Sequence, residues 1–341
     1  MKSMSSIRSL ISFFLILFLG QLHAQDRDIV ESFLKKLKVE YPQFSLIYLN
    51  DNIQIKEFVI TDRYVVLMDA KWGTKGRSGS YFYLFDRQSM VVQDTLIMQQ
   101  VSPSFNNNLL VSEDRLFYRP KTGFLEEYTK KVFYDALTLS IPLEEGRFGS
   151  LGFHEDSGQA SENMFLHFRD ARNFIRSDTK KTVFYTINDK TQSYKFKDLA
   201  DYSYAKRSLY KYLFPSTVTS KGLVLIDGVA GKLVTANQNK SEKSSIVLPK
   251  EFNESILNAL LYDEQADRLY LRLVFKNDEK LYRLSGGEFR RLGINLPMAF
   301  SEVSIGIGYH RAMHIRDGKL YISLDIEEGG KSYDGLFVAD L

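Results

Sequence analysis

Short apolar runs bounded by turn residues follow one another from Phe44 to the end of the chain, the pattern typical of β-strands. Within this pattern a turn followed by an apolar strand recurs six times, and the recurrences start 52, 48, 58, 47 and 50 residues apart. A nearly constant interval of this size, with several strands in each unit, predicts a series of similar small β-sheets. The six segments are Asp62–Leu67, Asp114–Tyr118, Glu162–Leu166, Ser220–Leu225, Asp267–Leu271 and Asp317–Ile322.

Each repeat divides into as many as four strands. We expect strands at 53–60, 64–70, 81–85 and 91–98 in the first repeat, and at 256–262, 268–275, 281–284 and 289–294 in the fifth. The third strands of the other repeats are expected at 132–134, 183–185, 232–234 and 336–338. These strands are apolar on both faces, so each sheet needs a neighbour on either side.

The last repeat has only three strands before the chain ends at Leu341, whereas a spare strand at 44–49 precedes the first repeat. We expect the spare strand to complete the last sheet, so that no sheet edge is left open between the two ends of the chain. The alternative is that it forms an edge strand of the first sheet.

Over residues 43–341, the period and the strand order resemble those of six-bladed β-propeller proteins of bacterial secretion and envelope systems. The resemblance implies an all-β, six-bladed β-propeller, a single domain whose ring is closed by the N-terminal strand. Its blades would lie at approximately 50–100, 101–145, 146–200, 208–249, 250–297 and 298–341, the last together with 44–49. The signature of a particular propeller family is missing, because Trp72 is the only tryptophan and paired glycines occur in two repeats only. Folds of this type host unrelated activities, so the resemblance implies no specific activity.

Residues 1–24 are predicted to be a signal peptide. Lys2 and Arg8 form the positively charged N-terminal region of such a peptide. The apolar run 10–19 that follows is too short to span a bilayer, which needs about 20 residues. Residues 22–24 provide a cleavage site, and the alternative is an uncleaved N-terminal anchor.

An amphipathic helix is expected within 25–42. Apolar residues recur at helical spacing from Ile29 to Leu37, with polar residues between them. Pro42 ends the pattern, because proline cannot continue a helix.

The composition favours a protein exported into a bacterial envelope, either periplasmic or extracellular. The chain has no cysteine, which suits that location better than a eukaryotic secretory route and excludes a thiol nucleophile or a cysteine-ligated metal. The net charge is +3, or about +1 without the signal segment, which is too small for a nucleic-acid-binding surface. No later apolar run is long enough for a transmembrane span.

Antiparallel sheets of four strands divide their connections between two ends. The turns from strand one to two and from three to four lie at one end and are short here. The connections from strand two to three, and from sheet to sheet, lie at the other end and are long. Long segments on a rigid scaffold often carry binding residues, so this second end is the candidate binding surface. The long segments are 71–80, 119–130, 144–159, 170–181, 199–217 and 295–311.

Aromatic and basic residues within these long segments are the candidate ligand-binding residues. Tyrosine and tryptophan faces beside arginine can hold sugars, carboxylates or a protein partner. The candidates are Trp72, Arg77, Arg172, Arg176, Tyr202, Tyr204 and Arg207, together with His154 beside Glu155 and Asp156. The alternative is that the aromatic residues serve packing and the basic residues form a solvated surface.

No catalytic or metal-binding motif is recognisable, and no catalytic residue is assigned. His310 and His314 are four residues apart, but in a loop and a strand that spacing has no special meaning. Asp263 and Asp267 lie at a turn, where aspartate bonds to its own backbone. We expect no metal site and no cofactor, with calcium left open as an alternative.

We interpret the chain as a non-catalytic exported binding protein for a protein, peptide or glycan ligand. One alternative is a propeller hydrolase or lactonase-like enzyme, with its site and a calcium ion at the central channel. The other is a structural component of an envelope assembly that docks through the N-terminal helix. An apolar helix face that is not packed on a sheet would favour this last role. The sequence does not predict the oligomeric state.

Overall fold

The computed structural model describes the strands, many of the turns and the N-terminal helix. The described residues are 24–50, 53–71, 79–99, 109–112, 115–118, 137–149, 152–155, 165–168, 173–177, 181–186, 189–195, 216–227, 230–236, 241–255, 257–275, 278–296, 312–328 and 331–341. In this part of the chain there is one α-helix, α2 (Ala24–Glu40), and one short 3-10 helix, η4 (Lys250–Glu254). All other elements are β-strands, so the expected all-β fold is confirmed. The predicted signal peptide lies almost entirely outside the described residues.

The described strands form six antiparallel sheets, numbered here from first to sixth along the chain. The first contains β2 (Ile55–Ile60), β3 (Tyr64–Lys71), β4 (Gly79–Asp86) and β5 (Val92–Gln99). The second contains β6 (Leu109–Ser112), β7 (Arg115–Tyr118), β8 (Leu137–Glu144), β9 (Arg147–Phe148) and β10 (Gly152–Glu155). The third contains β11 (Phe165–Phe168), β12 (Asn173–Ser177), β13 (Lys181–Thr186) and β14 (Asp189–Lys195).

The remaining three sheets complete the described chain. The fourth contains β15 (Ser216–Thr219), β16 (Gly222–Asp227), β17 (Lys232–Ala236) and β18 (Ser241–Val247). The fifth contains β19 (Leu257–Asp263), β20 (Arg268–Val274), β21 (Glu279–Ser285) and β22 (Glu288–Arg291). The sixth contains β23 (Met313–Arg316), β24 (Lys319–Glu328), β25 (Lys331–Asp340) and β1 (Ser45–Asn50).

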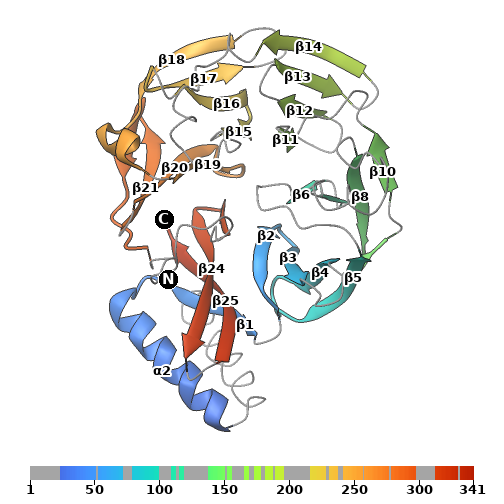
Figure 1. Ribbon diagram of the computed structural model, residues 1–341, viewed down its shortest axis with the longest axis vertical. Coiled ribbons are helices and arrows are strands. Elements are labelled where there is room, and N and C mark those ends of the chain that lie inside the picture. Colours follow the sequence, from blue (N-terminus) through green and yellow to red (C-terminus); the bar gives the residue numbers. More distant parts are fainter. Residues whose placement is uncertain are drawn as a thin grey trace, which may run out of the picture.

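The sheets are arranged around a common centre, with the first strand of each sheet innermost (Figure 1). Contacts between these inner strands join β2 to β6, β11 to β15, β15 to β19, and β19 to β23. The inner strand of the sixth sheet then contacts that of the first, because β23 contacts β2. The chain therefore returns to its starting sheet.

The expected pairing of the spare N-terminal strand is confirmed. β1 pairs antiparallel with β25 as the outer strand of the sixth sheet, with Leu49 opposite Gly335 and Asn50 opposite Asp334. The register shifts between Leu46 and Tyr48, where the pairing is irregular. The alternative, an edge strand of the first sheet, is wrong, because the outer strand of that sheet is β5.

Buried apolar side chains lie between neighbouring sheets. On β3, Val66 and Met68 belong to the cluster shared with Leu116 of the second sheet. Val65 and Leu67 on the other face belong to the cluster shared with the sixth sheet. This two-sided burial explains why the strands read as nearly continuous apolar runs.

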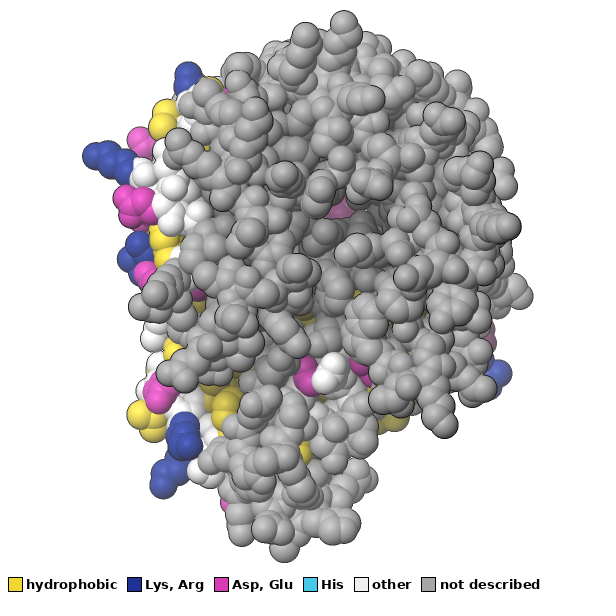
Figure 2. Space-filling model, viewed as in Figure 1, with side chains coloured by type: hydrophobic (Ala, Val, Ile, Leu, Met, Phe, Trp, Pro, Cys, Tyr) yellow, Lys and Arg dark blue, Asp and Glu magenta, His cyan; other side chains and the backbone are white. Residues whose placement is uncertain are grey.

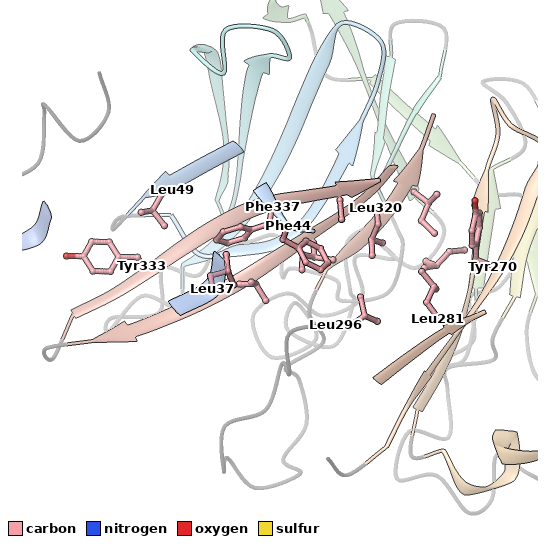
Figure 3. Packing of buried hydrophobic residues seen from close by; sticks show 14 residues of the cluster. Leu37, Phe44, Leu49, Tyr270, Leu281, Leu296, Leu320, Tyr333 and Phe337 are labelled. Atoms are coloured by element: carbon pink, nitrogen blue, oxygen red, sulfur yellow. The ribbon is translucent and has the colours of Figure 1, made fainter. Parts of the chain in front are cut away.

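The cluster between the fifth and sixth sheets also receives the N-terminal helix (Figure 3). Leu37 of α2 is buried there, Phe33 and Leu34 pack against the same cluster, and the rings of Phe33 and Phe337 lie 6.4 Å apart. The expected helix is present, and it ends before Pro42. The apolar face of the helix packs on the sixth sheet. An assembly-docking role would have been favoured by an unpacked face, so the position of the helix does not favour that role.

Two expectations for the second and third sheets are wrong. The segment Glu162–Leu166 runs into β11, the innermost strand of the third sheet, whereas the other recurrences lead into second strands such as β3 and β20. The short alternating run of β11 looks like a second strand, since pattern alone does not distinguish strand order. In addition, the third strand of the second sheet is β8, and the expected strand 132–134 lies outside the described residues.

Candidate functional site

The two ends of the sheets differ in the length of their connections. At one end, the short-turn end, strand one passes to strand two through turns such as 61–63, 220–221, 264–267 and 317–318. The connections from strand two to three and from sheet to sheet leave the strands at the opposite end, the long-connection end; the longest of these, 72–78, 119–136, 196–215 and 292–312, lie mostly outside the described residues. The strand boundaries agree with the expected division for these connections, whereas 178–180, 228–231, 275–278 and 329–330 at the same end are as short as the turns at the other end.

Polar side chains tie the short turns of neighbouring sheets together. Asp263, at the end of β19, accepts the backbone N–H of Gly318 at 2.7 Å and that of Asp317 at 3.2 Å. Its Oδ1 also accepts the N–H of Ala266 at 3.3 Å within its own turn. The local bonding expected for Asp263 is thus only part of its role, because the same carboxylate holds the first turn of the next sheet.

The same end joins the sixth sheet to the first. Arg87 donates to the carbonyl oxygen of Thr61 at 2.8 Å and to the hydroxyl of Tyr321 at 3.0 Å, and it pairs with Asp317 at 3.3 Å. Arg316 donates to Asp62 at 2.7 Å.

Asp62 also receives a hydrogen bond from Gln265 of the fifth sheet at 2.8 Å. The hydrogen bond and the charge of Arg316 lower the pKa of Asp62, although its side chain is largely exposed. Inner turns of the fifth, sixth and first sheets therefore meet at one carboxylate.

A third link joins the fourth and fifth sheets. Asp267 accepts hydrogen bonds from the hydroxyls of Tyr262 at 2.7 Å and Ser220 at 2.9 Å. These two bonds lower the pKa of Asp267. Residues of the recurring turns therefore serve contacts between sheets, and the short-turn ends of four sheets lie together.

His314 lies between the sixth and first sheets. Its ring packs edge-on to that of Phe58, with the two ring centroids 6.4 Å apart. Its buried Nδ1 makes no hydrogen bond within the described residues. Burial, and then the charge of Arg316, lower the pKa of His314 to about 4, so the imidazole is neutral at pH 7. The described part of the chain contains no group of three metal-ligating side chains, and His310 lies outside it.

Buried polar side chains gather at the long-connection end. Most of them lie toward the long-connection ends of their strands, or just before β19, although some of the connections that follow are short; these residues are Glu57, Asp69, Ser80, Asp227, Ser255, Asn258, Arg272, Glu279 and Asp334. By contrast, Thr219 and Asp263 are buried at the short-turn end, and Ser323 lies midway along β24. Burying charge is costly unless partners compensate it, and each of these side chains takes part in an interaction with other groups of the protein.

Acidic residues meet where the sixth sheet joins the first. Asp334 accepts the backbone N–H of Ile55 at 3.2 Å, and Ile55 is paired in register with the buried Asp69. Burial raises the pKa of the Tyr83 phenol, and the nearby Asp69 carboxylate raises it further. Asp69, Asp334 and Tyr83 thus form an acidic and phenolic group at this seam.

In the fifth sheet, a buried ion pair lies at the same end. Nε of Arg272 and Oε1 of Glu279 are 2.6 Å apart, and both side chains are almost completely buried. Neither this pair nor Asp69 and Asp334 were predicted from the sequence. The signal available was a charged residue within an otherwise apolar strand, as in the run from Tyr64 to Ala70.

Two of the eight expected ligand-binding residues lie in described strands. His154 is in β10, opposite Thr138, and Arg176 is in β12, opposite Leu166 and Val183. The expectation that 144–159 and 170–181 are loops is therefore wrong over these strands, because alternating residues there continue the sheets. Outside the described residues lie Trp72, Arg77, Arg172, Tyr202, Tyr204 and Arg207.

In the face of the molecule seen in Figure 2, a few acidic side chains of the described residues are visible near the middle, and acidic and basic side chains alternate at the outer rim.

Comparisons with known proteins gave structural likeness only. No protein-family model matches the chain, and no curated protein sequence matches it. A protein described as exported, from Bacteroides fragilis NCTC 9343, is 8% identical with a TM-score of 0.48, covering 88% of this chain and 96% of that one.

The polysaccharide lyase Uly1 is 10% identical with a TM-score of 0.40, covering 86% of this chain and 91% of the lyase. TolB from Acinetobacter baumannii is 10% identical with a TM-score of 0.34, covering 82% of this chain and 69% of TolB. Likeness at these scores carries no inference about function.

Among the described residues, no helix combines the length and the apolar character needed to cross a membrane.

Proposed function

We propose that this chain is an exported, non-catalytic binding protein. It is built as a six-bladed β-propeller whose ring β1 closes, and it holds a protein, peptide or glycan ligand at the long-connection end. The return of the inner strands from β23 to β2 and the pairing of β1 with β25 support the closed ring. The signal-like segment 1–24 supports export.

The short-turn end supports the proposal as a rigid base. Its turns are short, and carboxylates such as Asp263 and Asp62 tie them to the neighbouring sheets. Short turns tied in this way leave little irregular backbone for a ligand to contact. The long-connection end is therefore the better place for recognition.

The observation that carries the proposal is the concentration of buried polar groups at the long-connection end. Asp69 and Asp334 of one seam and the Arg272–Glu279 pair lie at this end. Buried charged groups with specific partners are more common at functional sites than elsewhere in a protein.

The described charges at the seam are acidic, so the ligand would offer hydrogen-bond donors or positive charge. Sugar hydroxyls and basic peptide side chains have this chemistry, and tyrosine rings such as that of Tyr83 add an apolar surface for either.

A binding screen tests the proposal. The purified protein is labelled and applied to a glycan array and to a panel of synthetic peptides of differing charge, and its metal content and melting temperature are measured before and after chelation. We expect a glycan or peptide to bind without a stoichiometric metal ion. A tightly held divalent ion, a melting temperature that falls on chelation and turnover of an ester or lactone would instead establish the hydrolase alternative.

A further inference from the structure

The sixth and first sheets meet at the one junction of the ring that the chain itself does not close. From the first sheet to the sixth, the chain leaves the outer strand of each sheet and enters the inner strand of the next. The sixth sheet is different, because β23, β24 and β25 come from one end of the chain and β1 from the other (Figure 1). Separating β1 from β25 would therefore open the ring without breaking the chain.

β1 is held less firmly than the central strands of the sheets. It pairs with β25 and with no other described strand, and this pairing is irregular between Leu46 and Tyr48. Of its six residues only Leu49 is buried, whereas six of the seven residues of β20 are buried. Strands with few buried contacts open at a lower free energy than the core of a protein.

An ionisable ring nitrogen is buried at this junction. His314 on β23 faces the first sheet, where its ring packs against that of Phe58 on β2. Its Nδ1 is buried and has no hydrogen-bond partner among the described residues. Within the sixth sheet it is opposite Tyr321, whose hydroxyl accepts a hydrogen bond from Arg87 of the first sheet. The imidazole therefore lies among the contacts that hold the two sheets together.

Charged and titratable groups surround His314 from the described elements packed against it. They are Tyr321 and Lys319 on β24, Asp263 at the end of β19, Asp62 and Arg87 of the first sheet, and Arg316 and Asp317, which follow His314 along the chain. On β2 itself, Glu57 is opposite Met68, so its side chain points toward the second sheet. Asp69 lies toward the other end of the first sheet, beside Ile55.

The carboxylates near His314 already have partners. Asp263 accepts three backbone N–H groups, two of them from the turn after β23. Asp62 pairs with Arg316, and Asp317 pairs with Arg87. A protonated imidazole would add a positive charge beside two arginines, and none of the described carboxylates around it is free to balance that charge. Burying an unpaired charge is costly.

We propose that His314 is an acid-sensitive latch: protonation of its imidazole separates the first sheet from the sixth, releases β1 from β25 and opens the ring. In the open ring the imidazolium reaches water and no longer lies beside the two arginines. The inference rests on the closed ring of the proposed function, but it does not depend on the ligand or on where the ligand binds.

The pH range of the latch follows from the two states of the ring. Burial and the charge of Arg316 hold the pKa of His314 at about 4 in the closed ring. In the open ring, where the side chain is hydrated, we expect the ordinary pKa of 6.5. The open ring then binds more protons between these two values, so the opening constant rises about 20-fold from pH 7 to pH 5.

Hydrogen exchange of the backbone amides tests the proposal. It is measured by mass spectrometry at pH 7 and pH 5, and each rate is corrected for the intrinsic exchange rate at that pH. We expect the protection of β1 to fall about 20-fold at pH 5, and that of β20 in the fifth sheet to stay unchanged. His314→Gln should remove the fall. His154→Gln, on β10 of the second sheet, is the matched control and should keep it.

A reversible crosslink between β1 and β25 gives a second test that keeps His314 in place. The chain has no cysteine of its own, and Ser45 of β1 and Val338 of β25 are partners in register. With Ser45→Cys and Val338→Cys joined by a disulfide, β1 should keep its protection at pH 5. Reduction of the disulfide should restore the fall. If His314→Gln does not fold, the crosslinked protein decides.

The results that contradict the latch differ from those that contradict the closed ring. A β1 without protection at pH 7 would overturn both. Equal protection of β1 at pH 7 and pH 5, a fall of the same size in β20, or a fall that persists in His314→Gln or in the crosslinked protein would overturn the latch alone.

Discussion

The carboxylate of Asp263 accepts the backbone N–H of Gly318 at 2.7 Å, so the residue that ends β19 holds the first turn of the sixth sheet. With the bond from the N–H of Asp317, one buried side chain satisfies two backbone donors of a neighbouring sheet. The sheets are thus joined by specific polar contacts as well as by apolar packing.

Removing this carboxylate should destabilise the fold. Asp263→Ala leaves two N–H groups without their acceptor, and we expect the free energy of unfolding to fall by about 2–4 kcal/mol. Urea denaturation followed by circular dichroism measures the change. Glu264→Ala, at the exposed neighbouring position, should change it by less than about 0.5 kcal/mol. Equal effects of the two substitutions would contradict the assigned role.

The seam between β1 and β25 is packed too closely for an added methyl group at Gly335. A Cβ atom there would lie 2.5 Å from Cε2 of the buried Phe337 and 3.4 Å from Cδ1 of Leu49. Gly335→Ala should therefore lower the free energy of unfolding by about 1–3 kcal/mol.

Gly293→Ala is the control for this substitution, because a Cβ atom at Gly293 meets nothing within 4 Å. It should leave the melting temperature nearly unchanged. Full stability of Gly335→Ala would show that β1 does not pack on β25 as described.

The stability of the fold should fall strongly when one partner of the buried Arg272–Glu279 ion pair is replaced. Glu279→Gln leaves the guanidinium of Arg272 buried without its counter-charge, and we expect a loss of about 3–5 kcal/mol. Glu288→Gln in the exposed strand β22 should cost less than about 0.5 kcal/mol. Thermal melts of the two variants provide the comparison, and similar melting temperatures would refute the prediction.

His314 should make stability depend on pH between about 4 and 6.5. Its pKa falls from 6.5 to about 4 in the folded chain, so the unfolded chain binds more protons within this window. Stability is therefore complete above pH 6.5 and is lost as the pH falls toward 4.

Carboxylates also make stability depend on pH, but they titrate mostly below the window of pH 4 to 6.5. Replacing His314 therefore isolates its own contribution to the pH dependence. Between pH 7 and pH 5 we expect the free energy of unfolding of the unsubstituted protein to fall about 1–2 kcal/mol more than that of His314→Gln. Parallel pH profiles for the two proteins would show that His314 is not buried neutral.

The strand pattern predicted most of the fold where turns and apolar runs are regular. In the fifth repeat the expected strand 268–275 corresponds to β20, and the expected pairing of 44–49 with the last sheet is present as β1. The prediction for the third repeat was wrong because β11 has the same short alternation of side chains that a second strand would have. Local pattern does not encode the order of strands within a sheet.

The candidate site was less predictable than the strands. Asp263 was expected to bond within its turn, and it does, but the acceptor role toward the sixth sheet depends on which turns meet in space. Asp69 and Asp334 are far apart in sequence; the pairing of β2 with β3 brings Asp69 to Ile55, and the contact between the sixth and first sheets brings Asp334 there. Contacts of this kind depend on the tertiary arrangement and produce no recognisable pattern in the spacing of residues along the sequence.

The most direct test of the central claim compares the two ends of the ring with the best ligand from the binding screen. Isothermal titration would give its affinity for the unsubstituted protein, for Trp72→Ala in the segment that follows β3, for Asp69→Asn at the long-connection end, and for Asp62→Asn at the short-turn end. We expect about a tenfold or greater loss of affinity for the first two variants and no change for the third. A loss confined to Asp62→Asn, with Trp72→Ala and Asp69→Asn binding normally, would contradict the placement of the site.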